Sequence, residues 1–335
     1  MLLDWQEHLL EDPTHNMAHY LLEFEKPLID LEERILALET SVGEDGADSE
    51  KIRELKSERD EKLKDIYSHL SRWQRVQLAR HPKRPYTLDY IKEWSPDFIE
   101  LHGDRHFADD TSVVCGLGSL GDVPVFYIGQ QKGRNTKENL YRNFGMMRPE
   151  GYRKTLRIME LAEKFNRPVV TLVDTPGAYP GIGAEERGQG EAIAKNLLKM
   201  AALKTPILTI VIGEGASGGA LGIGVCDKML MLENTWYSVI SPEGCASILW
   251  RDSAKASEAA DAMKVTPQDL IEMGICDRVV PEPVGGAHRN PKETADILKS
   301  IILEELTILS KVDKNSFLEN RIARYEKMGV FQENN

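Results

Sequence analysis

A glycine-rich segment at Gly213–Gly219, which reads GEGASGG, could present main-chain amides to a ligand. It follows the apolar run Pro206–Ile212 and precedes a stretch with the composition of a helix. Glycines allow the backbone to turn sharply, and they let a ligand approach the N–H groups of the turn. Two amides at the start of a helix can stabilise a single negatively charged oxygen. The segment therefore predicts an oxyanion hole, and a tight turn without a ligand is the alternative.

The same segment allows a second chemistry, because Gly215–Gly219 (GASGG) fits the pattern G-x-S-x-G. In serine hydrolases this pattern places the nucleophile on a sharp turn between a strand and a helix. Ser217 would then be the nucleophile, and it would need a histidine later in the chain. His288 is the histidine that follows it, within GGAHRNP, which we expect to be a loop. A serine hydrolase is therefore an open alternative.

A second segment, Asp174–Gly181 (DTPGAYPG), closes the apolar run Pro168–Asp174. Its DTPG resembles the metal and phosphate turn of GTPases, but no G-x-x-x-x-G-K-[ST] precedes it and no Asn-Lys-x-Asp follows. We interpret it as a rigid loop at the carboxyl end of a strand, where α/β proteins bind ligands. The candidate substrate-contacting residues of the two segments are Gly177, Ala178, Tyr179, Gly181, Gly215 and Ser217.

A basic stretch between Gln131 and Arg157 reverses the charge of a chain whose formal net charge is −12. Its cations are Lys132, Arg134, Lys137, Arg142, Arg148, Arg153, Lys154 and Arg157. Such a cluster is typical of a site for an anionic ligand or an acidic partner. We therefore predict that Lys132 and Arg134 contact substrate, with a solvated helix face as the alternative.

Composition excludes several function classes. The net charge of −12 argues against bulk nucleic-acid binding.

The cysteines (Cys115, Cys226, Cys245 and Cys276) form no C-x-x-C pair, so we expect no zinc ribbon here and reduced thiols in a cytosol-like compartment. No HExxH, paired carboxylates or Cys/His cluster predicts a metal site. The most apolar stretch, Ile207–Cys226, holds Glu214 and six glycines, so we expect no membrane span. The acidic start of the chain resembles neither a signal nor a transit peptide.

Apolar periodicity divides the chain into four parts. Residues 20–80 have helical spacing interrupted by the polar segment Gly43–Ser49, which predicts a helical hairpin arm. Residues 81–325 contain short apolar runs that alternate with helix-like stretches, the pattern of an α/β domain whose strands are buried on both faces. Gly121-Asp122 predicts a β-hairpin, and 291–328 a charged helical cap. Residues 1–19 form an extension, with Met17 as a second candidate start, and 326–335 a tail.

Several long segments, in the same order along the chain, resemble the alpha subunits of the acetyl-coenzyme A carboxylase carboxyltransferase family. The resemblance covers roughly residues 20–325, and Ala216 is a departure, because family members can have glycine there. The matching segments are Ala79–Tyr90 (ARHPKRPYTLDY), Gln131–Arg134 (QKGR), Arg142–Met146 (RNFGM), Pro149–Lys154 (PEGYRK), Asp174–Gly190, Gly213–Gly224, Tyr237–Trp250 (YSVISPEGCASILW), Pro281–Pro283 (PEP) and Gly285–Pro291 (GGAHRNP).

The resemblance implies a crotonase-like spiral of ββα units and an α2β2 assembly with a beta subunit that carries the zinc ribbon. It implies transfer of a carboxyl group to acetyl-CoA, giving malonyl-CoA for fatty-acid synthesis. The donor is carboxybiotin, held on a biotin carboxyl carrier protein and charged by biotin carboxylase, so no cofactor is expected to be bound covalently to this chain. The amides of Gly218 and Gly219 would form the oxyanion hole for the biotin urea oxygen.

Three alternatives stay open at this stage. Related carboxyltransferases act on other acyl-CoA thioesters, and the sequence does not reveal the pocket that sizes the acyl group. A crotonase-like hydrolase that uses Ser217 is the second alternative, and a non-catalytic scaffold for the partner is the third. We expect a cytoplasmic protein, or a plastid stromal one in a plant.

Overall fold

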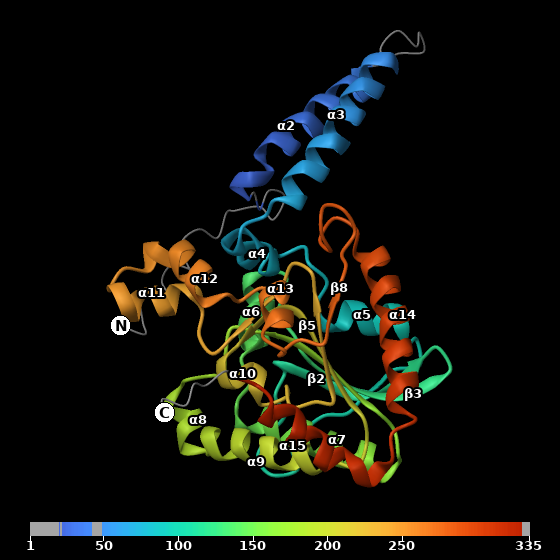
Figure 1. Ribbon diagram of the computed structural model, residues 1–335, viewed down its shortest axis with the longest axis vertical. Coiled ribbons are helices and arrows are strands. Elements are labelled where there is room, and N and C mark those ends of the chain that lie inside the picture. The colour runs from blue at the N-terminus through green and yellow to red at the C-terminus, as the bar shows by residue number, and fades with distance from the viewer. Residues whose placement is uncertain (1–19, 21, 42–48, 330–335) are drawn as a thin grey trace, which may run out of the picture.

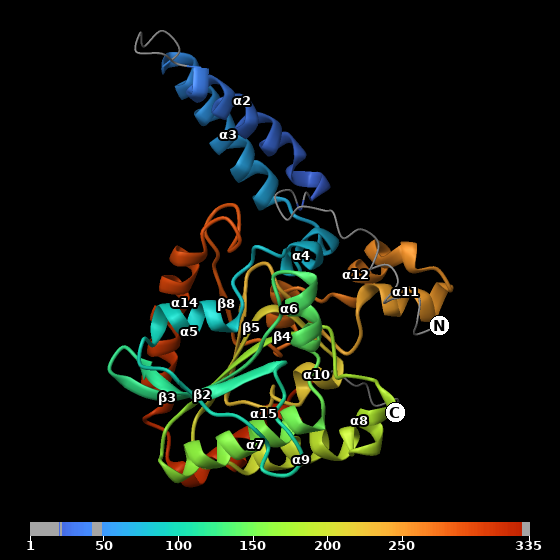
Figure 2. The same ribbon diagram turned by 180° about the vertical axis from the view of Figure 1, so that it is seen from behind.

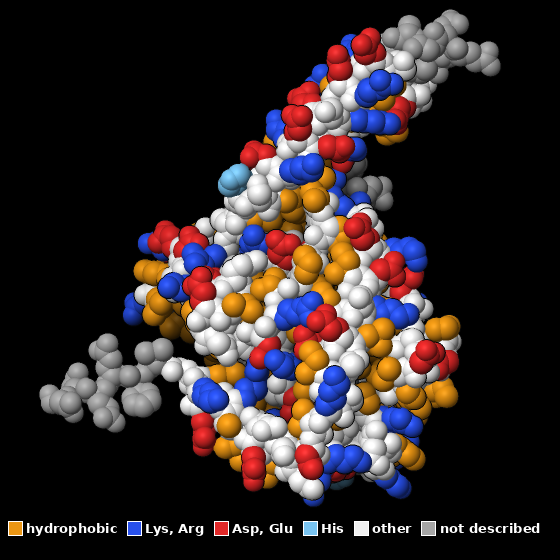
Figure 3. Space-filling model, turned by 45° about the vertical axis from the view of Figure 1, so that its right-hand side comes forward, with side chains coloured by type: hydrophobic (Ala, Val, Ile, Leu, Met, Phe, Trp, Pro, Cys, Tyr) orange, Lys and Arg blue, Asp and Glu red, His pale blue; other side chains and the backbone are white. Residues whose placement is uncertain are grey.

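The computed structural model describes residue 20, residues 22–41 and residues 49–329. It consists of a helical hairpin that projects from an α/β body (Figures 1 and 3). The predicted extension (1–19), residues 43–48 of the polar break and the last residues of the predicted tail (330–335) lie outside the described residues. Within the described part of the chain, no helix combines the length and the apolar character that a membrane crossing requires.

The hairpin consists of α2 (Lys26–Ser41) and α3 (Ser49–Ser68), preceded by the short 3-10 helix η2 (Glu23–Glu25). Leu31 and Ile35 of α2 pack against Leu55 of α3 in a small core of their own. The arm predicted over residues 20–80 is longer than this hairpin. The next helix, α4 (Arg72–Ala79), packs against α12 (Ala256–Met263) and the sheet, so it belongs structurally to the body.

One eight-stranded sheet forms the centre of the body, in the order β1-β2-β3-β4-β5-β6-β8, with β7 beside the end of β5. β1, β2 and β3 are antiparallel, whereas β3 to β8 are parallel neighbours. The strands are β1 (Ile99–Glu100), β2 (Val113–Leu120), β3 (Val123–Gln130), β4 (Val169–Thr175), β5 (Ile207–Ala216), β6 (Lys228–Leu232), β7 (Trp236–Ser238) and β8 (Arg278–Val280).

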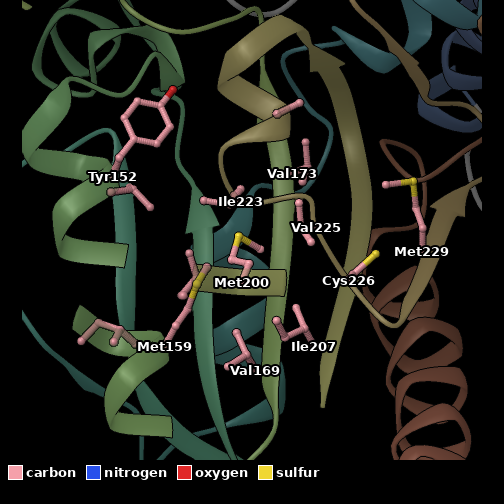
Figure 4. Packing of buried hydrophobic residues seen from close by; sticks show 14 of the residues in the cluster. Tyr152, Met159, Val169, Val173, Met200, Ile207, Ile223, Val225, Cys226 and Met229 are labelled. Carbon is pink, nitrogen blue, oxygen red and sulfur yellow. The ribbon is translucent and has the colours of Figure 1, made fainter. Parts of the chain in front are cut away.

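Helices cover both faces of the sheet (Figures 1 and 2). On one face, α7 (Pro149–Lys164), α9 (Gln189–Ala202) and α15 (Phe317–Glu326) lie together. Figure 4 shows Met159 and Met200 from these helices packed on Val169 and Ile207 of the strands. On the other face, α5 (Thr87–Trp94) and α14 (Pro291–Leu309) cover the neighbouring strand positions Val170 and Leu208.

The remaining elements are short helices and 3-10 helices. They are α6 (Thr136–Tyr141), η3 (Asn143–Gly145), α8 (Ile182–Glu186), α10 (Ser217–Leu221), α11 (Pro242–Trp250), η4 (Ser253–Lys255), α13 (Pro267–Glu272) and η5 (Lys314–Ser316).

Most of the expected elements form, with differences that concern the site. The hairpin at Gly121-Asp122 pairs Leu120 with Val123. The expected helix Ala184–Leu203 is instead two helices, interrupted at Gly188, whose φ is 80°. The strand expected to end at Ile212 continues to Ala216, so most of the glycine-rich segment is strand. The short strands β1 and β8 were not expected from the sequence.

Candidate functional site

The carboxyl ends of β3, β4 and β5 meet at one edge of the sheet, because the three strands are adjacent and parallel. β3 ends at Gln130, β4 at Thr175 and β5 at Ala216, where α10 begins at once. The two sequence segments with predicted chemistry, Asp174–Gly181 and Gly213–Gly219, are therefore neighbours in space.

Two glycines of the glycine-rich segment serve packing rather than a ligand. A Cβ atom on Gly213 would lie 2.4 Å from Oδ1 of Asp174, and one on Gly215 would lie 2.6 Å from the ring of Tyr237. Gly215 is buried within β5, opposite Thr175 of β4 and Tyr237 of β7. The prediction that Gly215 contacts substrate is therefore not supported by its position.

The turn itself begins at Ser217, which is exposed and has a φ of 56°. Gly218 and Gly219 follow in the first turn of α10, where the main-chain N–H groups have no intrahelical partner. A Cβ atom on Gly219 would lie 2.3 Å from the carbonyl carbon of Gly177 and 2.5 Å from its oxygen. Only glycine fits there, so the two predicted loops touch through their backbones.

The Asp174–Gly181 loop has internal supports. The hydroxyl of Thr175 donates to the carbonyl of Gly177 at 2.8 Å and accepts the N–H of the same residue at 3.2 Å. Tyr179 is half-buried beneath the guanidinium of Arg148, at 4.9 Å from the ring centroid. A Cβ atom on Gly181 would lie 2.4 Å from that ring. Ala178 is half-buried beside the tip of the loop. Gly177, Ala178 and Tyr179 thus remain candidate wall residues, whereas Gly181 makes room for Tyr179.

A buried charge network lies directly behind the two loops. The ammonium of Lys132 donates to Asp174 and to Glu214, both at 2.7 Å. Arg80 donates to the other oxygen of Glu214 at 2.8 Å and to Glu243 at 2.5 Å. Burial alone would raise the pKa of Glu214, but Lys132 and Arg80 outweigh burial and lower the pKa to about 2. The two carboxylates in turn hold the pKa of Lys132 above its ordinary value, against the effect of burial.

The basic stretch is mostly neutralised or bonded within the chain. Arg134 donates to the carbonyls of Pro82 and Arg84 and to Asp89, and its guanidinium lies 4.1 Å from the ring centroid of Tyr86. The other internal partners include Asp104 for Arg153, Asp109 for Lys154 and the carbonyl of Thr111 for Arg142. These contacts do not support the prediction that Lys132 and Arg134 bind an anionic substrate directly, and they indicate that both residues position the surrounding loops.

Three residues of the site were not predicted to act there. Arg80 and Glu214 belong to the charge network, and Gln130 joins the two loops, since its carboxamide accepts from the N–H of Asp174 and donates to the carbonyl of Gly219. Glu214 lies inside the glycine-rich segment, next to an apolar run. An acidic residue in that position could have been recognised from the sequence as a candidate site residue. Gln130 and Arg80 carried no comparable signal.

His288 does not support a serine hydrolase. It lies in a loop, as expected, and its ring packs against His81 at 4.1 Å between centroids while its Nε2 lies 3.4 Å from Glu25. Among the contacts that the structure describes, none joins His288 to Ser217. The hydroxyl therefore has no base among the predicted candidates.

Glu25, His81 and His288 are the group of potential metal ligands among the described residues. Nδ1 of His81 accepts the N–H of Lys83 at 3.2 Å, so the proton of this neutral ring sits on its other nitrogen. Neither nitrogen then offers a free lone pair to a metal. Tyr67 and Arg289 also donate to Glu25, at 2.7 and 3.2 Å. We interpret the cluster as the joint between the helical arm and the body.

Comparison with known proteins identifies the family of the chain. Residues 21–329 match the family model described as acetyl co-enzyme A carboxylase carboxyltransferase-like. The chain belongs to this family. Curated relatives called acetyl-coenzyme A carboxylase carboxyl transferase subunit alpha include that of Chlorobaculum parvum, 54% identical over 94% of this chain and 98% of the relative. The protein of Synechococcus elongatus is 52% identical over 93% of this chain and 96% of its own length.

Solved structures with the same fold are more distant in sequence. The transcarboxylase 12S core with methylmalonyl-coenzyme A bound has a TM-score of 0.51 at 20% identity and covers 65% of this chain and 42% of its own. A Pseudomonas malonate decarboxylase hetero-tetramer in complex with coenzyme A has a TM-score of 0.53 at 16% identity and covers 64% of this chain and 86% of its own. The fold of the body is thus the crotonase-like fold that the family resemblance implied.

Proposed function

We propose that this chain is the alpha half of a carboxyltransferase that moves a carboxyl group from carboxybiotin to acetyl-CoA, forming malonyl-CoA. One observation carries the assignment of the site within that function. Gly219 is pressed against the backbone of Gly177 at the start of α10, where a Cβ atom would lie 2.3 Å from the Gly177 carbonyl carbon. A helix start held this firmly presents the amides of Gly218 and Gly219 as fixed donors.

The proposed role of these amides follows from the charge that the reaction develops. When the bond between the biotin nitrogen and the carboxyl carbon breaks, CO2 leaves and the electron pair remains on the urea group. Its oxygen becomes negative and is stabilised by the two amides. The freed biotin nitrogen takes a proton from the methyl group of acetyl-CoA, and the resulting carbanion attacks CO2. The protein then needs no general base, which fits the absence of a carboxylate or histidine partner for Ser217 among the described contacts.

The site needs further surfaces from other proteins under this proposal. Relatives are named as alpha subunits, which supports a beta partner. We propose an α2β2 assembly in which the beta subunit stabilises the thioester enolate and carries a zinc ribbon. A biotin carboxyl carrier protein brings the carboxybiotin, which biotin carboxylase has charged, within a cytosolic complex. The role of Gly177, Ala178 and Tyr179 is to line the site for the biotin ring.

A reconstitution assay tests the proposal. The purified chain is mixed with acetyl-CoA and carboxybiotin, first alone and then with the beta subunit, and malonyl-CoA is measured. We expect product only when both subunits are present. Full turnover by the chain alone would contradict the shared site, and no product from the complex would contradict the assigned reaction. Propionyl-CoA in parallel reports the selectivity for the acyl group.

A further inference from the structure

Gln130 is a fully buried side chain that joins the two loops of the site. It occupies the last position of β3. Its Nε2 donates to the carbonyl oxygen of Gly219 at 2.8 Å, and its Oε1 accepts the N–H of Asp174 at 3.0 Å. Both partners are main-chain groups of buried residues, so losing the carboxamide would leave a buried donor and a buried acceptor without a partner.

The bond to Gly219 adds a side-chain restraint to a turn that is also packed against the backbone of Gly177. Glycine rotates freely about φ and ψ because it has no side chain. α10 spans only Ser217–Leu221, so it makes few intrahelical hydrogen bonds of its own. The hydrogen bond at its C-terminal end joins the N–H of Gly222 to the carbonyl of Gly218 at 2.9 Å. The carbonyl of Gly219 belongs to the same residue as one of the proposed donor N–H groups. The Gly219 N–H shares its peptide plane with the Gly218 carbonyl, which the N–H of Gly222 holds. Gln130 holds the next peptide plane, so the planes on both sides of the Gly219 Cα are restrained, and this narrows the φ and ψ open to that residue.

We propose that Gln130 is a positioning residue of the oxyanion hole, which aims the amides of Gly218 and Gly219 through its hold on the Gly219 carbonyl. The inference rests on the proposed function, because it concerns the donors to the biotin urea oxygen. A displacement of about 1 Å from reactive geometry can cost roughly 10²-fold in rate. Loosening the turn should therefore affect kcat more than the binding of either substrate.

Asn196 offers a matched control at the other end of α10. It is also a fully buried carboxamide, and its Nδ2 donates to the carbonyl of Gly222 at 2.9 Å. Gly222 is the C-cap residue directly after α10, away from the amides at its start. Replacing each carboxamide by an apolar side chain of similar size, Gln130→Met and Asn196→Leu, removes one bond to a main-chain carbonyl in or next to α10. Each change also removes one further bond, from the N–H of Asp174 in the first case and to the hydroxyl of Thr155 in the second.

The experiment measures kcat, KM for acetyl-CoA and the melting temperature of each variant in complex with the beta subunit. We expect Gln130→Met to lower kcat by roughly tenfold to a hundredfold with KM within about twofold. Asn196→Leu should lower the melting temperature while kcat stays within about twofold of the wild type. Equal kcat values for the two variants would overturn the positioning role. A wild-type complex that makes no malonyl-CoA would instead refute the proposed function itself.

A second variant, Gln130→Glu, keeps the test decisive if the methionine variant fails to fold. A protonated glutamic acid can reproduce both bonds, since its O–H donates to Gly219 and its carbonyl accepts from Asp174. An ionised carboxylate would repel the Gly219 carbonyl, and burial favours the neutral form. We expect kcat relative to the wild type to rise as the pH is lowered from about 8.5 to about 6.5. The proposal would be overturned if this ratio did not change with pH. A role of Gln130 in stability alone predicts that unchanged ratio, because at temperatures well below melting a change in stability does not alter kcat.

Discussion

Gly219 and Gly177 approach each other so closely that a single methyl group on Gly219 would lie 2.3 Å from the Gly177 carbonyl carbon. Gly218, one residue earlier, has space, because its nearest atom would be Cδ1 of Ile193 at 3.4 Å. The two donors of the proposed oxyanion hole therefore differ in what they tolerate.

The first prediction uses this difference. Gly219→Ala should lower kcat by roughly 10²–10³, the range for losing an oxyanion-hole donor, because the methyl group forces the turn away from Gly177. Gly218→Ala should lower kcat less. As a control, Gly190→Ala places a Cβ atom where no neighbour lies within 4 Å and should leave kcat unchanged. Both kcat and melting temperature are measured on the complex. A Gly219→Ala variant that melts early but turns over normally would show that Gly219 serves packing alone.

The second prediction concerns Ser217, whose left-handed φ of 56° resembles that of a hydrolase nucleophile. We expect Ser217→Ala to reduce kcat by less than about tenfold, equivalent to roughly 1.4 kcal/mol, because none of the contacts described for this structure brings a base to the hydroxyl. A fluorophosphonate probe should not label the wild-type protein. Covalent labelling at Ser217, or a loss of several orders of magnitude, would support the hydrolase instead.

The third prediction concerns the role of Lys132. Replacing it with methionine leaves Asp174 without its cation in a buried position, so we expect the free energy of unfolding to fall by about 3–5 kcal/mol. Adding Asp174→Asn should recover part of this loss, since the unpaired charge is removed. Lys137→Met, at an exposed position in the same stretch, should have little effect. Chemical denaturation measures all four proteins. A Lys132→Met variant that is as stable as the wild type but has a raised KM would contradict this prediction and would support a role of Lys132 in substrate binding.

The fourth prediction concerns pH and His81. Burial and the neighbouring His288 lower the pKa of His81 to about 3. In the unfolded chain the imidazole of His81 is protonated near pH 6.5. Between about pH 3 and pH 6.5 the unfolded chain therefore binds more protons than the folded protein. Stability from this group is therefore complete above about pH 6.5 and decreases as the pH falls, by about 2 kcal/mol at pH 5.

The comparison with His81→Asn measures that contribution. The asparagine oxygen can still accept the N–H of Lys83, but it does not titrate. We expect the loss of unfolding free energy between about pH 7 and pH 5 to be smaller in this variant. His69, which is 77% exposed, provides the control, because His69→Asn should leave the slope as in the wild type. An identical slope for the wild type and His81→Asn would contradict the assignment.

The strands and the site loops could be predicted because their signals are local. Apolar runs such as Pro206–Ile212 are long enough to identify buried strands, and the glycines that follow them indicate close backbone approach. The sequence could not say which glycine serves which purpose. Gly213 and Gly215 make room for Asp174 and Tyr237, and only the pairing of strands places those side chains there.

Residues that act across the sheet could not be predicted for the same reason. Gln130 bonds to residues 44 and 89 positions later in the chain, a relationship that depends on the order of the strands. The basic stretch was interpreted as a ligand surface because its acidic partners, such as Asp89 and Asp104, lie in a separate part of the sequence. The sequence of a segment gives the sign of its charge. Whether acidic residues from elsewhere neutralise that charge depends on how the chain folds.

The site is assembled from the ends of three adjacent strands, and this makes it indivisible. A single cut at the exposed Lys204, between β4 and β5, would leave Gln130 and Asp174 on one fragment and the amides of α10 on the other. The second fragment would keep both amides but would lose the contacts of Gly219 with Gly177 and Gln130 that hold them in place. Reassociation through the β4–β5 pairing would bring these contacts together again, so the proposed site depends on the continuity of the sheet rather than on that of the chain.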